Sequence, residues 1–144
     1  MVLNILLKNL LKLLDKMKTL GVGVDIIELS RIEAAVSRWG DRFLRRIYTE
    51  GELQFSKSRI PQLAGRFASK EAVMKALGTG LRGVSWREIE VVRARGQAPQ
   101  IVLQGRAANR AQQMGIYRFS ISISHSRDYA IAMVIGETNE TRNR

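Results

Sequence analysis

The stretch "RFASKEAVMKALGTG", residues 66–80, decides the fold because it predicts most of one long helix. The helix is expected to begin after Pro61 and to end at Gly78, since proline suits a first helical turn and glycine suits the residue after the last one. Glu71 and Lys75 are four residues apart and therefore share one side of this helix. The apolar residues recur at helical spacing and predict a buried side, formed by Leu63, Phe67, Ala68, Val73, Met74 and Leu77.

Strand-like patterns lie on both sides of the long helix. "LGVGVDIIEL" (20–29) predicts a buried strand that ends near Asp25, with two glycines on one side and two valines on the other. "IEVVRARGQAPQIVLQG" (89–105) predicts two strands joined by a turn around Gly96. In "YRFSISISHSRDYAIAMVIGE" (117–137), isoleucine and serine alternate with the period of a strand, and a second apolar strand follows a turn.

Shorter helices are predicted between these strands. The pattern turns helical after Ile26, with an interruption at Gly40 and Asp41, and "TEGE" (49–52) has the spacing of a capping box. Residues 106–115 predict a short helix that a glycine ends. The order is one strand, helices, two strands, a helix and two strands. This order predicts an α+β fold in which a mainly antiparallel sheet packs on the long helix.

Composition restricts the class of protein. A chain of 144 residues predicts a single domain with one modest core. The absence of cysteine excludes disulfides and zinc–thiolate sites and favours a reducing, cytoplasmic location. The net charge of +11 predicts an anionic partner, which could be a nucleic acid, a membrane surface, a phosphorylated ligand or an acidic protein.

Residues 1–18 form an amphipathic basic extension before the domain at 19–137, and residues 138–144 form a polar tail. The helix is too short and too charged to cross a bilayer. It could pack on the body or on another subunit, lie on a membrane, or be incidental if Met17 is the natural start; the membrane is the least favoured of these. Its apolar side carries Leu3, Leu6, Leu7, Leu10, Leu13, Leu14 and Met17, and its other side carries Lys8, Lys12 and Lys16.

Two carboxylates are candidates for chemistry. Asp25 lies inside the apolar run "GVGVDII", where an acid is costly unless it is paired or bound to a cation. Together with Glu71 it could hold Mg²⁺, which takes one or two protein carboxylates together with substrate phosphates and water. The alternative is that Asp25 caps the following helix and that Glu71 forms only a surface ion pair with Lys75.

The sequence supports a functional role more strongly for some basic residues than for others. Lys75, one turn beyond Glu71, could neutralise the charge of a phosphate, whereas Lys70 is predicted to be a solvated lysine. His125 is the only histidine, at the end of a strand, and is a weak signal by itself. One helical face is predicted to carry Arg31, Arg38, Arg42 and Arg45 if the break at Gly40 is mild, which suits an acidic helix, phosphates or a nucleic-acid backbone.

Three motifs occur in order: "GVGVDIIELSRIE" (21–33), "RFASKEAVMKALGTGL" (66–81) and "FSISISHSRDYAIAMVI" (119–135). With them the chain resembles the holo-[acyl-carrier-protein] synthases, the small bacterial 4′-phosphopantetheinyl transferases, over about residues 19–137. The resemblance implies Mg²⁺-dependent transfer of phosphopantetheine from coenzyme A to a serine of apo-acyl carrier protein, with release of adenosine 3′,5′-bisphosphate. Members of the family usually begin almost at the first motif, so residues 1–18 are additional.

The resemblance also implies roles for residues. Asp25 and Glu71 match the magnesium ligands, and with Lys75, a leaving-group and phosphate contact, they form the catalytic set. The base is either a metal-associated water or Glu71. Arg66 and His125 match coenzyme A contacts.

Partners are implied in the same way. The acidic carrier protein is expected on the helix after the first strand, where Arg31 matches a docking arginine and Arg38 and Arg42 extend the patch. Homotrimers are expected, with each active site between subunits, so that Asp25 and Glu71 meet a neighbour's His125. The alternative function is a basic nucleic-acid-binding module without catalysis, although the aromatic platform of single-strand binders is missing.

Overall fold

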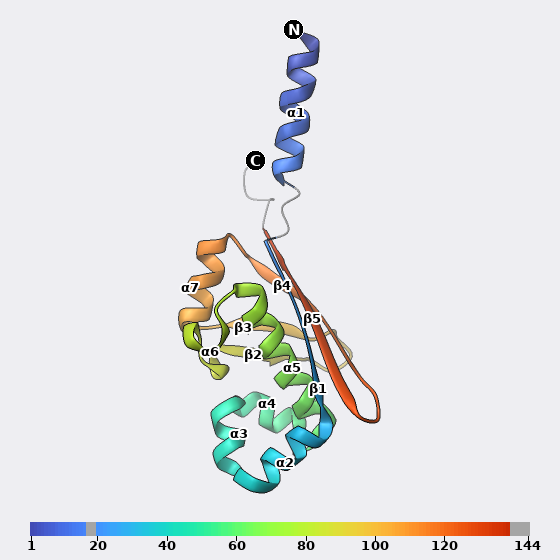
Figure 1. The fold of residues 1–144 in the computed structure, drawn as a ribbon, viewed down its shortest axis with the longest axis vertical. Coiled ribbons are helices and arrows are strands. Elements are labelled where there is room, and N and C mark those ends of the chain that lie inside the picture. Colours follow the sequence, from blue (N-terminus) through green and yellow to red (C-terminus); the bar gives the residue numbers. More distant parts are fainter. Residues whose placement is uncertain (17–19, 139–144) are drawn as a thin grey trace.

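The computed structural model describes residues 1–16 and 20–138 (Figure 1). Met17 and nearly all of the predicted polar tail lie outside the described residues. The elements follow the predicted order, which confirms the α+β class. They are α1 (Val2–Lys16), β1 (Gly21–Glu28), α2 (Leu29–Trp39), α3 (Asp41–Ile47), α4 (Glu50–Ser56), α5 (Ile60–Leu77), α6 (Gly80–Gly83), the 3₁₀ helix η1 (Trp86–Glu88), β2 (Ile89–Val92), β3 (Gln100–Leu103), α7 (Gly105–Met114), β4 (Arg118–His125) and β5 (Tyr129–Glu137).

Two antiparallel sheets are present. The larger has the strand order β1-β5-β4, and the smaller pairs β2 with β3. β1 pairs with β5 along its whole length, from Gly21 opposite Gly136 to Glu28 opposite Tyr129. The prediction that this strand ends near Asp25 is therefore wrong, because cross-strand hydrogen bonding continues for three more residues. Asp25 lies within the strand and does not cap a helix, so that alternative is also wrong.

The long helix α5 packs across β1 and β5 and forms the centre of the core (Figure 1). The two glycines of β1 lie on one side of the strand, as predicted, and this side faces α5. A Cβ on Gly23 would lie 1.8 Å from the carbonyl oxygen of Ala72, and a Cβ on Gly21 would lie 2.7 Å from that of Ala76. Only glycine permits so close an approach of two backbones, and this approach brings Asp25 next to the C-terminal half of α5.

The interruption at Gly40 is a full break. Gly40 has φ +51°, in the left-handed region, and it separates α2 from α3. A helical face cannot continue through such a residue, so the single face predicted for the four arginines is wrong. Arg31 and Arg38 lie on α2, whereas Arg42 and Arg45 lie on α3.

Two local predictions are confirmed at helix ends. Thr49 and Glu52 form the capping box of α4 through both reciprocal hydrogen bonds. Gly78 ends α5 with φ +69°. Both features depend on neighbours in the chain, which is why the sequence was sufficient to predict them.

One face of the larger sheet is uncovered. Apart from α1, which stands beyond the end of the sheet, the helices and the smaller sheet lie on its other side (Figure 1). Because side chains alternate along a strand, the uncovered face carries every second residue of β1 and β5. These apolar side chains are 40–58% exposed: Val22, Val24, Ile26, Tyr129, Ile131, Met133 and Ile135.

α1 also exposes its apolar side. Leu3, Leu6, Leu7 and Leu10 are 53–78% exposed, so among the alternatives for this helix the described residues do not support packing on the body of the same chain. α1 lies beyond the end of the larger sheet, away from the other labelled helices and strands, so none of these covers its leucines (Figure 1). Among the described helices, none has the length and apolar character needed to cross a membrane.

Candidate active site

Asp25, Glu71 and Lys75 form one cluster between β1 and α5. The Lys75 Nζ donates hydrogen bonds to Asp25 Oδ1 at 2.9 Å and to the Val24 carbonyl oxygen at 3.0 Å. The side chain of Lys75 is 54% exposed and that of Asp25 is 15% exposed. The close packing of Gly21 and Gly23 on α5 explains why residues from two distant segments meet here.

Electrostatics connects the two carboxylates. Partial burial raises the pKa of Glu71, and the negative charge of Asp25 raises this pKa further, while Lys75 and Arg31 act in the opposite direction. A cation bound between the two carboxylates would offset the charge of Asp25 that disfavours the ionisation of Glu71. Within the described residues there is no group of three or more His, Cys, Asp or Glu side chains that could hold a metal. Two carboxylates suffice for Mg²⁺, which takes its other oxygen ligands from phosphates and water.

A second group of predicted residues lines a separate cavity of about 580 Å³. Arg66 and His125 both line it, as do Arg59 and Arg93, which the sequence analysis did not identify. Arg66 is buried beside Phe55, with its guanidinium carbon 4.1 Å from the ring centroid. Its buried Nε has no hydrogen-bond partner among the described residues. Three arginines and a histidine around one cavity suit an anionic ligand.

The two groups lie on different sides of α5. At about 100° per residue, Arg66 points roughly 140° away from Glu71 and 180° away from Lys75 around the helix. Asp25 lies on β1, whereas His125 ends β4, with β5 between them. Within one chain the structure therefore brings Asp25, Glu71 and Lys75 together and brings Arg66 and His125 together, but it does not join the two groups.

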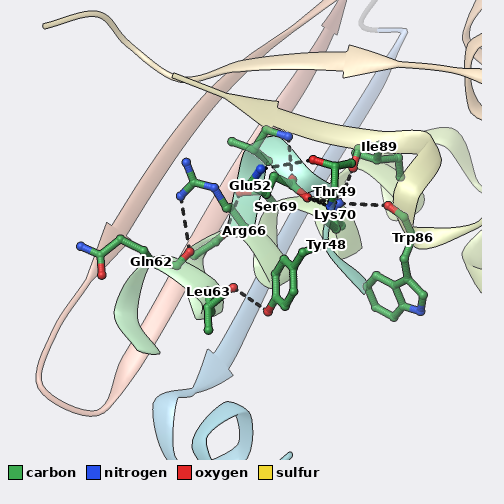
Figure 2. Close-up of polar contacts among 12 residues, drawn as sticks. Tyr48, Thr49, Glu52, Gln62, Leu63, Arg66, Ser69, Lys70, Trp86 and Ile89 are labelled. Carbon is green, nitrogen blue, oxygen red and sulfur yellow. Dashed lines mark hydrogen bonds and ion pairs between the residues drawn. The ribbon is translucent and has the colours of Figure 1, made fainter. Parts of the chain in front are cut away.

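The prediction that Lys70 is a solvated lysine is wrong. Its side chain is fully buried. Its Nζ lies 2.8 Å from Glu52 Oε2 and donates hydrogen bonds to the carbonyl oxygens of Trp86, at 3.0 Å, and Ile89 (Figure 2). The spacing already held a signal, because Lys70 lies at helical intervals from Leu63, Phe67 and Met74.

The buried ion pair fixes the position of α5. Glu52 Oε1 accepts a hydrogen bond from the Val91 amide at 2.8 Å, so the pair links α4, α5 and β2. Tyr48 adds a bond from its hydroxyl to the carbonyl oxygen of Leu63, at 2.9 Å (Figure 2). Burial lowers the pKa of Lys70, whereas the carboxylate of Glu52 opposes this shift. Because Glu71 is the next residue, holding Lys70 inward directs Glu71 toward Asp25.

The three arginines predicted to bind a partner are exposed. Arg31 lies 3.6 Å from Glu28 and is close enough to Glu71 to lower its pKa, so this arginine borders the carboxylate cluster. Arg38 stacks on Trp39, with 4.8 Å between the guanidinium carbon and the ring centroid. Arg42, on α3, lines a cavity of about 350 Å³ with Trp39. Arg31 and Arg38, seven residues apart, lie on one side of α2, whereas Arg42 lies on the next helix.

Comparison with known proteins identifies the family. The model of the 4′-phosphopantetheinyl transferase superfamily matches residues 21–134, which include the carboxylate cluster and the arginines and histidine of the second cavity. The chain belongs to this superfamily. The predicted family and the predicted class of enzyme, a phosphopantetheinyl transferase, are thereby confirmed.

Relatives within the superfamily are similar over nearly their whole length. The chain is 48% identical over 122 residues to the holo-[acyl-carrier-protein] synthase of Koribacter versatilis, covering 82% of this chain and 98% of that protein. It is 50% identical over 121 residues to the enzyme of the same name from Herpetosiphon aurantiacus, covering 79% and 95%. The crystal structure of Helicobacter pylori holo-[acyl-carrier-protein] synthase in complex with coenzyme A superposes with a TM-score of 0.74 at 34% identity, covering 81% of this chain and 99% of that one.

Proposed function

We propose that this transferase moves 4′-phosphopantetheine from coenzyme A to a serine of an apo-acyl carrier protein. The serine oxygen forms a bond to the phosphorus that carries pantetheine, and the phosphoanhydride bond to the adenosine side breaks. Adenosine 3′,5′-bisphosphate leaves, and the serine hydroxyl gives its proton to Glu71 or to a water molecule. The observation that carries this proposal is the Asp25–Glu71–Lys75 cluster, because it combines a site for a cation with a lysine in a chain of this superfamily.

Each residue of the cluster has a defined task. Asp25 and Glu71 would hold Mg²⁺, which supplies charge neutralisation at the pyrophosphate when it is bound. The ammonium group of Lys75 is more than half exposed, so it can exchange its bond to Asp25 for a contact with a phosphate oxygen. There it would stabilise the negative charge that develops on the leaving group. Residues of β1 and α5 thus orient the reacting phosphates.

Binding of coenzyme A requires the arginine-lined cavity as well. Arg66 and His125 would contact phosphates of the nucleotide, with Arg59 and Arg93 adding positive charge. Since α5 separates this cavity from the carboxylate cluster of the same chain, we infer that the two halves of each site come from neighbouring subunits. His125 of one subunit would then face Asp25 and Glu71 of the next.

The uncovered sheet face supports this assembly. Val24 lies opposite Met133, and Ile26 lies opposite Ile131, so the exposed apolar side chains form a continuous surface across β1 and β5. Exposed apolar surfaces of this kind are typical of subunit contacts. We propose that three copies of the chain bury this face around a threefold axis. Light scattering of the purified protein tests the trimer, and a monomeric mass would contradict it.

The carrier protein is proposed to bind over Arg31, Arg38 and Arg42. These side chains are exposed, and Arg31 borders the carboxylate cluster, so an acidic helix docked on them would bring its serine to the reacting phosphates. Reversing Arg31 and Arg38 to glutamate should raise the KM for carrier protein by about tenfold or more and should weaken coenzyme A binding far less. Equal losses for both substrates would contradict this docking surface.

The decisive test of the activity is intact-protein mass spectrometry of an apo-acyl carrier protein incubated with coenzyme A and the enzyme. We expect a gain equal to one phosphopantetheine, dependent on Mg²⁺. Absence of any gain, together with Mg²⁺-independent and steeply salt-dependent binding to nucleic acid, would instead support the basic nucleic-acid-binding alternative.

A further inference from the structure

The N-terminal helix α1 has no role in the proposed reaction. It precedes residue 21, where the superfamily match begins, and none of its described side chains belongs to the carboxylate cluster or lines the arginine-lined cavity. Yet it exposes more apolar surface than any other described helix: the exposed side chains are Val2, Leu3, Ile5, Leu6, Leu7, Leu10 and Leu11. A face of this size in contact with water indicates a partner.

The distribution of side chains around α1 indicates which partner. At 100° per residue, all of these apolar residues except Ile5 fall within roughly half of the circumference. Lys8 and Lys12 lie near the middle of the opposite half, and both are exposed. A coiled coil would bury a narrower seam and place its charges beside that seam. An apolar half opposed by a lysine-bearing half is the pattern of a helix that lies in the interface of a bilayer.

The positive charge of the protein favours an anionic partner for α1. The chain carries a net charge of +11, and the two lysines add positive charge at the helix itself. An anionic surface would attract the protein, whereas an electrically neutral apolar partner would use only the leucines. The combination of wide apolar face and positive charge is complementary to a membrane that contains anionic lipid.

We propose that α1 is a membrane-surface anchor, which binds anionic bilayers by inserting its leucine face while its lysines contact the headgroups. The anchor lies in the plane of the membrane and does not cross it, since α1 has only 15 residues. This inference does not depend on the proposed reaction.

Vesicle sedimentation of the full-length protein tests the proposal. Wild-type protein should bind vesicles that contain phosphatidylglycerol and should bind pure phosphatidylcholine vesicles much less. The double variant Leu6→Lys/Leu10→Lys gains positive charge but loses the apolar face, so the bound fraction should fall by about tenfold or more. The matched control Asn4→Lys/Asn9→Lys gains the same charge outside the leucine face and should bind at least as well as the wild type.

Three results would overturn the anchor. Absence of wild-type binding would do so directly. Equal binding by both double variants would show that the charge of the whole chain is responsible. If the wild type does not bind vesicles and light scattering gives Leu6→Lys/Leu10→Lys a lower oligomeric mass than the wild type, the leucine face would instead contact a second copy of the chain. Thermal unfolding of each variant checks that the domain is intact.

Discussion

Helix α5 carries two lysine–carboxylate pairs of nearly equal length in very different surroundings. Lys70 and Glu52 are 2.8 Å apart, and neither side chain is exposed. Lys75 and Asp25 are 2.9 Å apart, and the lysine side chain is more than half exposed. The first pair lies against β2 and α4, and the second lies at the edge of β1.

The surroundings decide what each pair can do. Glu52 and Lys70 satisfy each other and nearby backbone groups, so opening this pair would leave charges in the core, at a high cost in free energy. The Lys75–Asp25 pair can open because the lysine side chain is more than half exposed, so water can replace Asp25 as its partner. Consecutive residues, Lys70 and Glu71, therefore have different tasks: one holds the helix in place, and the other is available to a substrate.

The largest expected effect is on the rate of transfer when either carboxylate of the proposed cation site is replaced. Asp25→Asn and Glu71→Gln should each reduce phosphopantetheine transfer by about a thousandfold or more, because each removes a charge from the cation site. Stability should change little, as both replacements keep the shape of the side chain. Mass spectrometry of the carrier protein measures the rate, and thermal unfolding is the control. Full activity in either variant would contradict the assignment.

The next largest effect is expected on the stability of the fold when the buried Lys70–Glu52 pair is broken. Lys70→Met should reduce the free energy of unfolding by about 3–5 kcal/mol, because Glu52 would remain charged and unpaired in the core. Urea unfolding at a fixed protein concentration measures this change.

Glu52→Gln removes the other charge of the pair, and the double variant Glu52→Gln/Lys70→Met completes a double-mutant cycle. Since Glu52 and Lys70 also bind backbone groups, the double variant should recover only part of the loss. A loss below about 1 kcal/mol in Lys70→Met would show that the pair is dispensable.

A third prediction concerns the contact that creates the exposed site. Gly23→Ala should cost about 2–3 kcal/mol of stability and should slow transfer, because its methyl group would lie inside the contact distance of Ala72 and push β1 from α5. Gly21→Ala, with a longer distance of 2.7 Å to Ala76, should have a smaller effect on both. The reverse order, measured by unfolding and by the transfer rate, would refute this account.

The smallest change in stability is expected for Lys75→Met. An ion pair with an exposed lysine contributes less than about 1 kcal/mol, so the unfolding curve should be close to that of the wild type. Transfer should nevertheless fall by roughly tenfold or more, because the leaving group loses a cation. If Lys75→Met were as unstable as Lys70→Met, the difference between the two pairs would not hold.

Much of the fold was predictable because it depends on local chemistry. The limits of α5 follow from Pro61 and Gly78, the start of α4 follows from the Thr49–Glu52 capping box, and β4 follows from alternating isoleucine and serine. The grouping of Asp25, Glu71 and Lys75 was predicted from the motifs, and the structure brings these residues together. The roles of these residues stay predictions, as do Mg²⁺, the trimer and the cytoplasmic location.

The sequence by itself determined the order of elements, the glycine side of β1 and the spacing of Glu71 and Lys75, since each depends on neighbours along the chain. Only the tertiary structure decided where β1 ends, that Lys70 is buried, and that Arg59 and Arg93 join Arg66 and His125 around one cavity. The reason is physical. The free energy of a charged side chain depends on what packs against it, and for Lys70 that partner is Glu52, brought close by folding.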